Sequence, residues 1–176
     1  MKPLTLTSYD SPMGEFLIGG HNEHVYFVKL GEVDDRHSWL EKWRNKHSVD
    51  EPLHDLEAFP DVKQEFDRYF NDGLTNFTFK TEMIGTDFQK RVWQVLNEIP
   101  YGEQWTYKDI AEAINHPKAI RAVGGAINKN PISIAVPCHR VIGSDGSLTG
   151  YASGLNHKKF LLHHETKSSN WLHQTS

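Results

Sequence analysis

The chain has 176 residues, of which 38% are hydrophobic, and a formal net charge of −4. This length can bury a core, and it fits one large domain or two small ones. The sequence has no apolar run of the roughly 18 to 20 residues that would span a bilayer, and its first residues lack the apolar stretch of a secretory signal. These features predict a cytoplasmic chain with no membrane partner.

The charge is unevenly distributed along the chain. Residues 1–80 carry 9 Lys and Arg against 15 Asp and Glu, whereas residues 81–176 carry 10 against 8. No acidic residue lies between Glu112 and Asp145, and four basic residues do: Lys118, Arg121, Lys129 and Arg140. Such a window can approach phosphates without like-charge repulsion, although short basic runs are more often solvated surface.

Residues 1–80 predict a small antiparallel sheet with helices. Three β-branched and aromatic runs, separated by turn-forming residues, lie at 4–9, 15–19 and 24–30. Apolar spacing predicts a short helix at residues 39–43 and a second helix after Pro60. Residues 76–80 then return as an edge strand. Because no catalytic residue types cluster here, we interpret residues 1–80 as a scaffold domain.

Residues 81–176 form a second, mainly helical domain, so that the whole chain belongs to the mixed α/β (α+β) class. Capping-box spacing marks helix starts at Thr86 and Thr106. The second of these helices is broken at Asn115-His116-Pro117, and a new apolar stripe follows over residues 120–127. Two helices joined by such a short turn predict a helix-turn-helix.

The second helix of this pair is rich in small residues, which surround Arg121. They include Ala119, Ala122 and Gly124. Glycine inside a helix costs about 1 kcal/mol relative to alanine, so a close approach to another surface must offset it. That surface is either a neighbouring helix or a narrow DNA groove. Spacing alone favours packing within the protein, which is the commoner use of helical glycine.

Cys138 is the single cysteine, so it cannot form an internal disulfide and must be judged as a thiol. It follows an apolar run at residues 132–136, which predicts a buried strand or extended segment. A neighbouring histidine or arginine raises the thiolate fraction, and His139 and Arg140 supply both. Neighbours in a strand point to opposite faces, so His139 reaches the thiol only if the chain turns after Pro137. A buried, inert cysteine is the open alternative.

Loops and a final helix follow the cysteine. Residues 143–147 and 150–154 read as glycine-punctuated loops that suit a ligand pocket. Asn156 can cap the last helix, in which Glu165 is an acid able to orient a histidine, or simply a surface glutamate. The histidines at 21, 24, 163 and 164 lack the accompanying cysteine or acidic ligands of a zinc site. We interpret these histidines as surface residues.

The segment Pro137–Ile142 resembles the active-site signature of the O6-alkylguanine-DNA alkyltransferases, also called methylated-DNA-protein-cysteine methyltransferases. Further segments match in the same order over some eighty residues: Gly85–Gln89, Ile99–Gly102, Thr106-Tyr107, Arg121–Gly125, Asn130-Pro131 and Leu161–Glu165. Several ordered motifs are much more specific than one Cys-His pair. The N-terminal cysteines that bind zinc in some family members are missing here, so we expect no metal. Alkyl transfer to a thiolate would also need no cofactor.

The resemblance implies a set of catalytic residues. Cys138 would accept the alkyl group, with His139 drawing off its proton through a water and Glu165 orienting His139. Asn130 would tie the recognition helix to the active-site segment. Tyr107 would crowd the DNA phosphate, help to rotate the damaged nucleotide out and serve as a candidate donor to the departing guanine.

The resemblance also implies DNA and substrate contacts. Arg121 would enter the base stack, and Ala119, Ala122 and Gly124 would line the minor groove. The guanine would meet the Val141 carbonyl, the Tyr151 side chain and the Ala152 backbone N–H. Ser153 stands where many members have glycine, so it would narrow the pocket for the alkyl group.

The function implied is direct repair of double-stranded DNA that contains O6-alkylguanine, and also O4-alkylthymine. A monomer would transfer the alkyl group once to Cys138, after minor-groove binding and base flipping. Two other functions stay open. Family relatives without the cysteine bind alkylated bases and transfer nothing, and a Cys-His hydrolase would form an acyl intermediate that water clears.

Overall fold

The computed structural model describes residues 2–31 and 33–174, with side chains as far as residue 167. The chain divides into two compact units. The first comprises Met1–Ile84 with Pro131–Ser133, and the second comprises Gly85–Asn130 with Ile134–Ser176. The first unit is built on a sheet and the second is mainly helical, which confirms the predicted α+β class.

The sheet of the first unit has the order β3-β2-β1-β4. Its three main strands are antiparallel neighbours and match the three predicted runs: β1 (Thr5–Ser11), β2 (Gly14–His21) and β3 (His24–Lys29). The two-residue strand β4 (Leu53–His54) adds a parallel edge beside β1. The segment Pro131–Ser133 joins this unit through β3, where the Val28 N–H donates to the Pro131 carbonyl at 2.9 Å.

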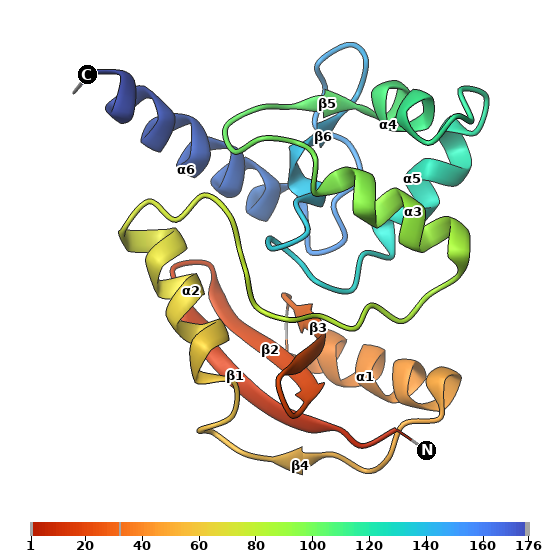
Figure 1. Cartoon of the computed structure of the whole chain (residues 1–176), viewed down its shortest axis with the longest axis vertical. Helices are drawn as coiled ribbons and strands as arrows, with labels where there is room; N and C mark the ends of the chain where they lie inside the picture. The colour runs from red at the N-terminus through yellow and green to blue at the C-terminus, as the bar shows by residue number, and fades with distance from the viewer. Residues whose placement is uncertain (1, 32, 175–176) are drawn as a thin grey trace. The chain divides into compact units, whose positions relative to one another are not determined.

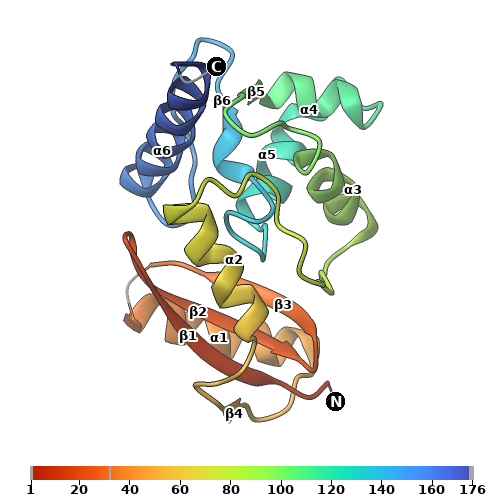
Figure 2. The ribbon, with the colours of Figure 1, turned by 60° about the vertical axis from the view of Figure 1, so that its left-hand side comes forward.

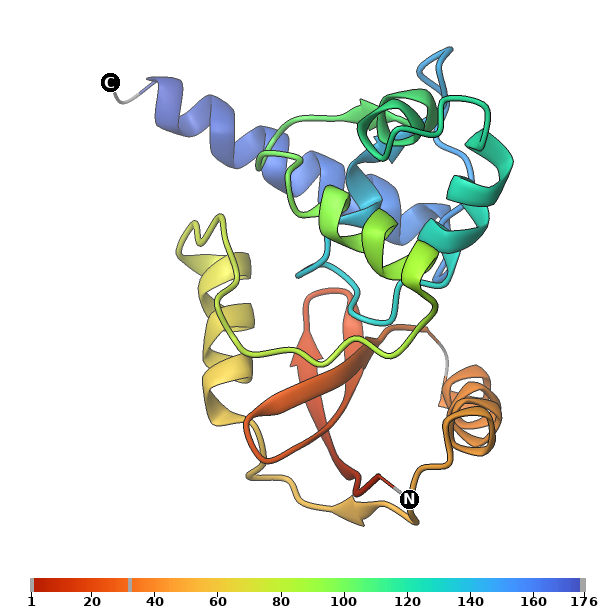
Figure 3. The same ribbon diagram turned by 45° about the vertical axis from the view of Figure 1, so that its right-hand side comes forward.

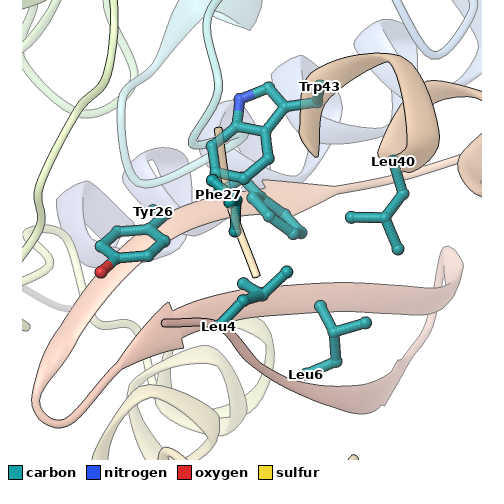
Figure 4. Close-up of a cluster of buried hydrophobic side chains, with 7 residues drawn as sticks. Leu4, Leu6, Tyr26, Phe27, Leu40 and Trp43 are labelled. Atoms are coloured by element: carbon teal, nitrogen blue, oxygen red, sulfur yellow. The ribbon is translucent and has the colours of Figure 1, made fainter. Parts of the chain in front are cut away.

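Helices α1 (Val33–His47) and α2 (Pro60–Asn71) cover opposite faces of the sheet (Figures 1 and 2). Strand alternation explains the division. One face packs against α1 in a cluster shown in Figure 4: Leu4, Leu6, Tyr26, Phe27, Leu40, Trp43 and Val49. On the other face, Tyr9 and Phe16 contact Phe66 of α2 at ring distances of 5.6 and 5.5 Å. The helix predicted at residues 39–43 is therefore the middle of a longer one.

The edge strand predicted at residues 76–80 is wrong. This segment is irregular, and the chain meets the sheet at its end, where the Val25 N–H donates to the Lys80 carbonyl at 3.0 Å and Val25 forms an isolated bridge with Thr81. The Glu65 carboxylate accepts both the backbone N–H and the hydroxyl of Thr78 at 2.7 Å. These bonds, and the packing of Phe77 on Phe66 at 5.1 Å, hold the segment against α2 instead of in a strand ladder.

The second unit contains four α-helices in its described part: α3 (Asp87–Leu96), α4 (Tyr107–Ala113), α5 (Ile120–Asn128) and α6 (Leu155–Gln174). Both predicted capping boxes are present, at Thr86 with Gln89 and at Thr106 with Asp109. Helices α4 and α5 pack together as the predicted pair, next to α3 (Figure 3). No helix among the described residues is long and apolar enough to cross a membrane.

Trp93 joins α3 to α5. Its side chain is 1% exposed, and its indole N–H donates to the Ala126 carbonyl at 2.8 Å. Gly85 lies directly against this indole, because a Cβ built on Gly85 would lie 2.5 Å from the Trp93 ring. The glycine before the first helix of this unit is therefore required by a close approach.

We predict that Gly85→Ala lowers the free energy of unfolding by about 1 to 3 kcal/mol, since the added methyl must displace a buried, hydrogen-bonded indole. Gly125→Ala is the matched control, because a Cβ at Gly125 in α5 meets nothing within 4 Å. There alanine should stabilise the helix by about 0.5 to 1 kcal/mol. Urea unfolding measures both, and equal stability of the two variants would contradict the packing assigned to Gly85.

Candidate active site

Cys138 begins a one-turn 3-10 helix, η1 (Cys138–Arg140), in the second unit. Its backbone N–H donates to the Val136 carbonyl at 2.8 Å, so the chain turns at Pro137, which is the condition for His139 to approach the thiol. The run before it is not a regular strand. Ile132 forms an isolated bridge with Val28, and Ile134 has a φ of 71°.

Cys138 is 8% exposed, and its thiol lies against Asn130. The Asn130 side-chain amide donates to Cys138 Sγ at 3.1 Å and to the Val136 carbonyl at 2.9 Å. Asn130 follows α5 closely, so one amide connects the end of that helix to the backbone before the cysteine and to the sulfur itself. A donor directed at sulfur favours the thiolate over the thiol.

His139, Arg140 and Glu165 form a buried polar group. The His139 Nε2 lies 2.8 Å from Glu165 Oε2, and Arg140 donates from Nε to Oε1 at 2.7 Å and from Nη2 to Oε2 at 3.0 Å. The remaining Arg140 amino group donates to the Ile99 carbonyl at 2.7 Å. Glu165 is thus no surface glutamate, and Arg140 is unavailable to phosphates, unlike the exposed Lys118, Arg121 and Lys129.

The electrostatics of this group favour a neutral imidazole. Burial lowers the pKa of His139, although the charge of Glu165 opposes the shift. Burial alone would raise the pKa of Glu165, but the hydrogen bonds from His139 and Arg140 and the charge of Arg140 lower it. In the neutral tautomer that donates Nε2–H to the carboxylate, Nδ1 is the basic nitrogen. This Nδ1 is buried and has no hydrogen-bond partner among the described residues.

Lys158 on α6 is a site residue that sequence reasoning missed. It is fully buried, and its ammonium donates to the Val141 carbonyl at 2.5 Å and to the Thr149 carbonyl at 3.1 Å. Burial lowers the pKa of Lys158, while negative charge on Cys138 opposes the shift. Lysine normally lies at the surface, so nothing in the local sequence signalled this position. The Val141 carbonyl expected to meet guanine already accepts this bond, and a carbonyl can accept a second.

Tyr107 begins α4 and reaches the loop before α6. Its hydroxyl donates to the Thr149 carbonyl at 2.8 Å, and burial raises the pKa of the phenol. A role as donor to guanine would require this bond to be exchanged. The next residue of the loop, Gly150, has a φ of 62°, and a Cβ there would lie 3.5 Å from the Tyr107 oxygen.

The other expected pocket residues follow in this loop. Tyr151 is half-buried with a buried hydroxyl, and its pKa is raised by burial first and then by negative charge on Cys138, with the Ser153 hydroxyl opposing. Ala152 is exposed. Ser153 Oγ lies 3.0 Å from Nδ1 of His157. The cap expected at Asn156 is wrong, since α6 begins at Leu155 and the Lys158 N–H reaches the Gly154 carbonyl.

The small residues expected to line the groove lie at the surface of α5 or at its N-cap. Ala122 is exposed, and Ala119 and Gly124 are half-buried, beside an exposed Arg121. A Cβ on Gly124 would meet only the Tyr107 ring, at an ordinary 3.9 Å. Alanine would fit at Gly124, so packing within the described chain does not demand glycine there. This weakens the packing interpretation that spacing alone had favoured.

No group of three or more His, Cys, Asp or Glu side chains that could hold a metal occurs among the described residues. His24 and His163 are exposed, and His21 is half-buried. The polar groups around Cys138 are a carboxylate, a guanidinium, an ammonium, an amide and an imidazole. This set can generate and hold a thiolate while a neutral imidazole accepts a proton.

The sequence matches two family models that together cover most of the chain. Residues 4–83 match the ribonuclease-like domain of 6-O-methylguanine DNA methyltransferase, and residues 87–167 match its DNA-binding domain. A methylated-DNA–protein-cysteine methyltransferase of Methanosarcina barkeri is 48% identical over 87% of this chain and 91% of that protein. The corresponding protein of Haemophilus influenzae is 44% identical over 92% and 86%.

Solved structures give the same result. The structure of Mycobacterium tuberculosis OGT in complex with DNA matches with a TM-score of 0.82 and 39% identity, covering 93% of this chain and 94% of that one. An O6-methylguanine-DNA methyltransferase from Pyrococcus kodakaraensis matches with a TM-score of 0.71 and 31% identity, over 92% and 98%. The chain belongs to the 6-O-methylguanine DNA methyltransferase family, as the resemblance implied.

We predict that Glu165→Gln lowers the free energy of unfolding by about 3 kcal/mol at pH 7, because it leaves the buried Arg140 without its counter-charge. A carboxylate with a lowered folded-state pKa contributes stability above its unfolded pKa of about 4.3 and loses it as the pH falls. The difference in the free energy of unfolding between the parent and the variant should therefore become smaller below about pH 4.3. Urea unfolding at a series of pH values measures this difference. A difference that stays constant with pH would contradict the ionised state assigned to Glu165.

Proposed function

We propose that the chain repairs double-stranded DNA by taking an alkyl group from O6-alkylguanine, or from O4-alkylthymine, onto Cys138. Each molecule reacts once and remains alkylated. The helical second unit binds the DNA and carries out the transfer, and the first unit is its scaffold. The protein acts as a monomer in the cytoplasm and uses no cofactor.

One observation carries this proposal: the buried imidazole beside the cysteine has a basic nitrogen with no partner. Glu165 occupies Nε2 of His139, and Nδ1 has no hydrogen-bond partner among the described residues. A buried polar atom of this kind needs a compensating partner, and one bound water could serve. Through that water, Nδ1 can take the proton of the Cys138 thiol. Asn130 and Lys158 then stabilise the sulfur charge.

The reaction follows from these groups. The thiolate of Cys138 attacks the alkyl carbon in line, so that a C–S bond forms as the C–O6 bond breaks and its electron pair goes to the guanine. The thiol proton passes to His139, and a donor such as Tyr107 assists the departing base. The product is a thioether, which no group in the described site can hydrolyse. A single turnover follows.

In this proposal, helix α5 binds the DNA. Its small exposed residues allow the backbone to enter the minor groove, and Arg121 occupies the space left by the damaged nucleotide. The base must leave the stack because O6 lies inside the duplex, and its weakened pairing lowers the cost of a few kcal/mol. Outside the duplex, the base meets the Val141 carbonyl, Tyr151 and the Ala152 N–H.

Two other functions make different predictions. A binding protein without transfer would need no nucleophile, yet here the Asn130 amide donates to the sulfur of Cys138 at 3.1 Å. A Cys-His hydrolase would clear its intermediate and turn over repeatedly. We therefore favour single transfer over both.

Intact-mass analysis tests this directly. After mixing with duplex DNA containing O6-methylguanine, we expect at most one methyl group per protein, located on Cys138 by peptide mapping. Cys138→Ser should bind the same DNA and gain no methyl group. More repaired guanine than protein would contradict single turnover, and an unmodified parent protein would contradict transfer.

We predict that Arg121→Ala slows repair of duplex DNA by about tenfold or more, because its side chain no longer fills the vacated stack, worth a few kcal/mol. The thiol should react at the parent rate with free O6-benzylguanine, which needs no flipping. Lys129→Ala, also an exposed cation near the end of α5, controls for general charge loss. Unchanged duplex repair by Arg121→Ala would overturn the groove assignment.

A further inference from the structure

The loop proposed to cover the alkyl group is held at both ends by the first turn of α6. At one end, the Lys158 ammonium donates to the Thr149 carbonyl, which also accepts the Tyr107 hydroxyl. At the other end, Nδ1 of His157 lies 3.0 Å from Ser153 Oγ. Residues 150–152, which include two of the proposed pocket residues, lie between these two attachments.

The attachment at Ser153 spans the start of the helix. The Lys158 N–H reaches the Gly154 carbonyl at 3.4 Å, and Gly154 has a φ of 109°. The loop therefore enters α6 through a conformation that only glycine adopts readily. The side-chain bond four residues apart limits the motion of this joint. His157 is half-buried, so its bond to the serine is partly shielded from water.

Tyr151, the proposed aromatic wall of the pocket, lies in the loop between these two attachments. Its hydroxyl is buried. A shift of Ser153 would therefore also displace Tyr151, two residues away. Ser153 affects the pocket in two separable ways, by the volume of its side chain and by its bond to His157.

We propose that His157 is a positioning residue that sets the range of alkyl groups the site accepts. It does so by holding Ser153, and with it the loop over Cys138, in one place. With the bond present, the loop resists displacement and a bulky adduct is penalised. With the bond absent, the loop can yield to a benzyl group, whereas methyl fits in either case. This inference rests on the proposed function.

Four variants separate the bond from the volume. Ser153→Ala removes the hydroxyl and keeps Cβ, and His157→Ala removes the other partner. The double variant tests whether they act together, and His157→Asn places an amide near the position of Nδ1 and should restore the bond. His163→Ala, an exposed histidine of the same helix, is the control. The readout is the ratio of transfer rates for O6-benzylguanine and O6-methylguanine in the same duplex.

We expect Ser153→Ala and His157→Ala each to raise the benzyl-to-methyl ratio by about two- to tenfold. This range corresponds to the free energy that one hydrogen bond contributes. The double variant should show no further rise, and His157→Asn and His163→Ala should stay near the parent ratio. Amide hydrogen exchange of residues 149–154 should be faster in both alanine variants. Ser153→Gly also removes Cβ, so any rise beyond Ser153→Ala measures the volume.

An unchanged ratio in His157→Ala, or independent effects that multiply in the double variant, would overturn the inference. So would a ratio in His157→Asn equal to that in His157→Ala. If the parent protein acquires no alkyl group on Cys138, the proposed function fails instead. In that case, amide hydrogen exchange of residues 149–154 still tests the attachment. Unchanged exchange in His157→Ala would show that His157 does not hold the loop.

Discussion

The site depends on one buried carboxylate, that of Glu165. An ionised carboxylate is costly to bury unless a counter-charge and hydrogen bonds compensate it, and Arg140 supplies both through two nitrogens. With that charge balanced, the carboxylate can accept from His139 without requiring a charged imidazole. The neutral ring then keeps a buried basic nitrogen, Nδ1. Removing Arg140 would therefore disturb His139 as well.

Helix α6 carries Lys158 as well as Glu165, so one helix contacts several parts of the site. Glu165 fixes η1, and Lys158, two turns earlier, holds the backbone of Val141 and Thr149. The same helix thus positions the nucleophile's neighbour and the loop beside it. The buried ammonium also balances charge, since a thiolate at Cys138 favours the charged form of Lys158. A proton lost from the thiol therefore leaves a negative charge in a site that already holds a positive one.

The sequence could predict interactions between residues that are close along the chain, but not those between residues that are far apart along it. The capping boxes at Thr86 and Thr106 act within three residues, so their helices were found correctly. Residues 76–80 do not form the expected strand because the carboxylate of Glu65, on α2, accepts the Thr78 N–H that a strand partner would have accepted. Lys158 was missed for a similar reason, since its carbonyl partners lie in another part of the chain. The roles of Cys138 and its neighbours came from the family resemblance, and their geometry came from the structure.

The net charge of −4 does not oppose a DNA partner once the charges are placed. At physiological salt, fields between exposed charges fade over about 8 Å, so the charges near a phosphate matter more than the total. Around α5 these are the exposed cations Lys118, Arg121 and Lys129 in a stretch without acidic residues. Arg140 does not add to them, because it is committed to Glu165. Three cations give modest electrostatic attraction. Contacts of α5 along the minor groove, and of Arg121 in the space left by the damaged nucleotide, must therefore supply much of the remaining affinity.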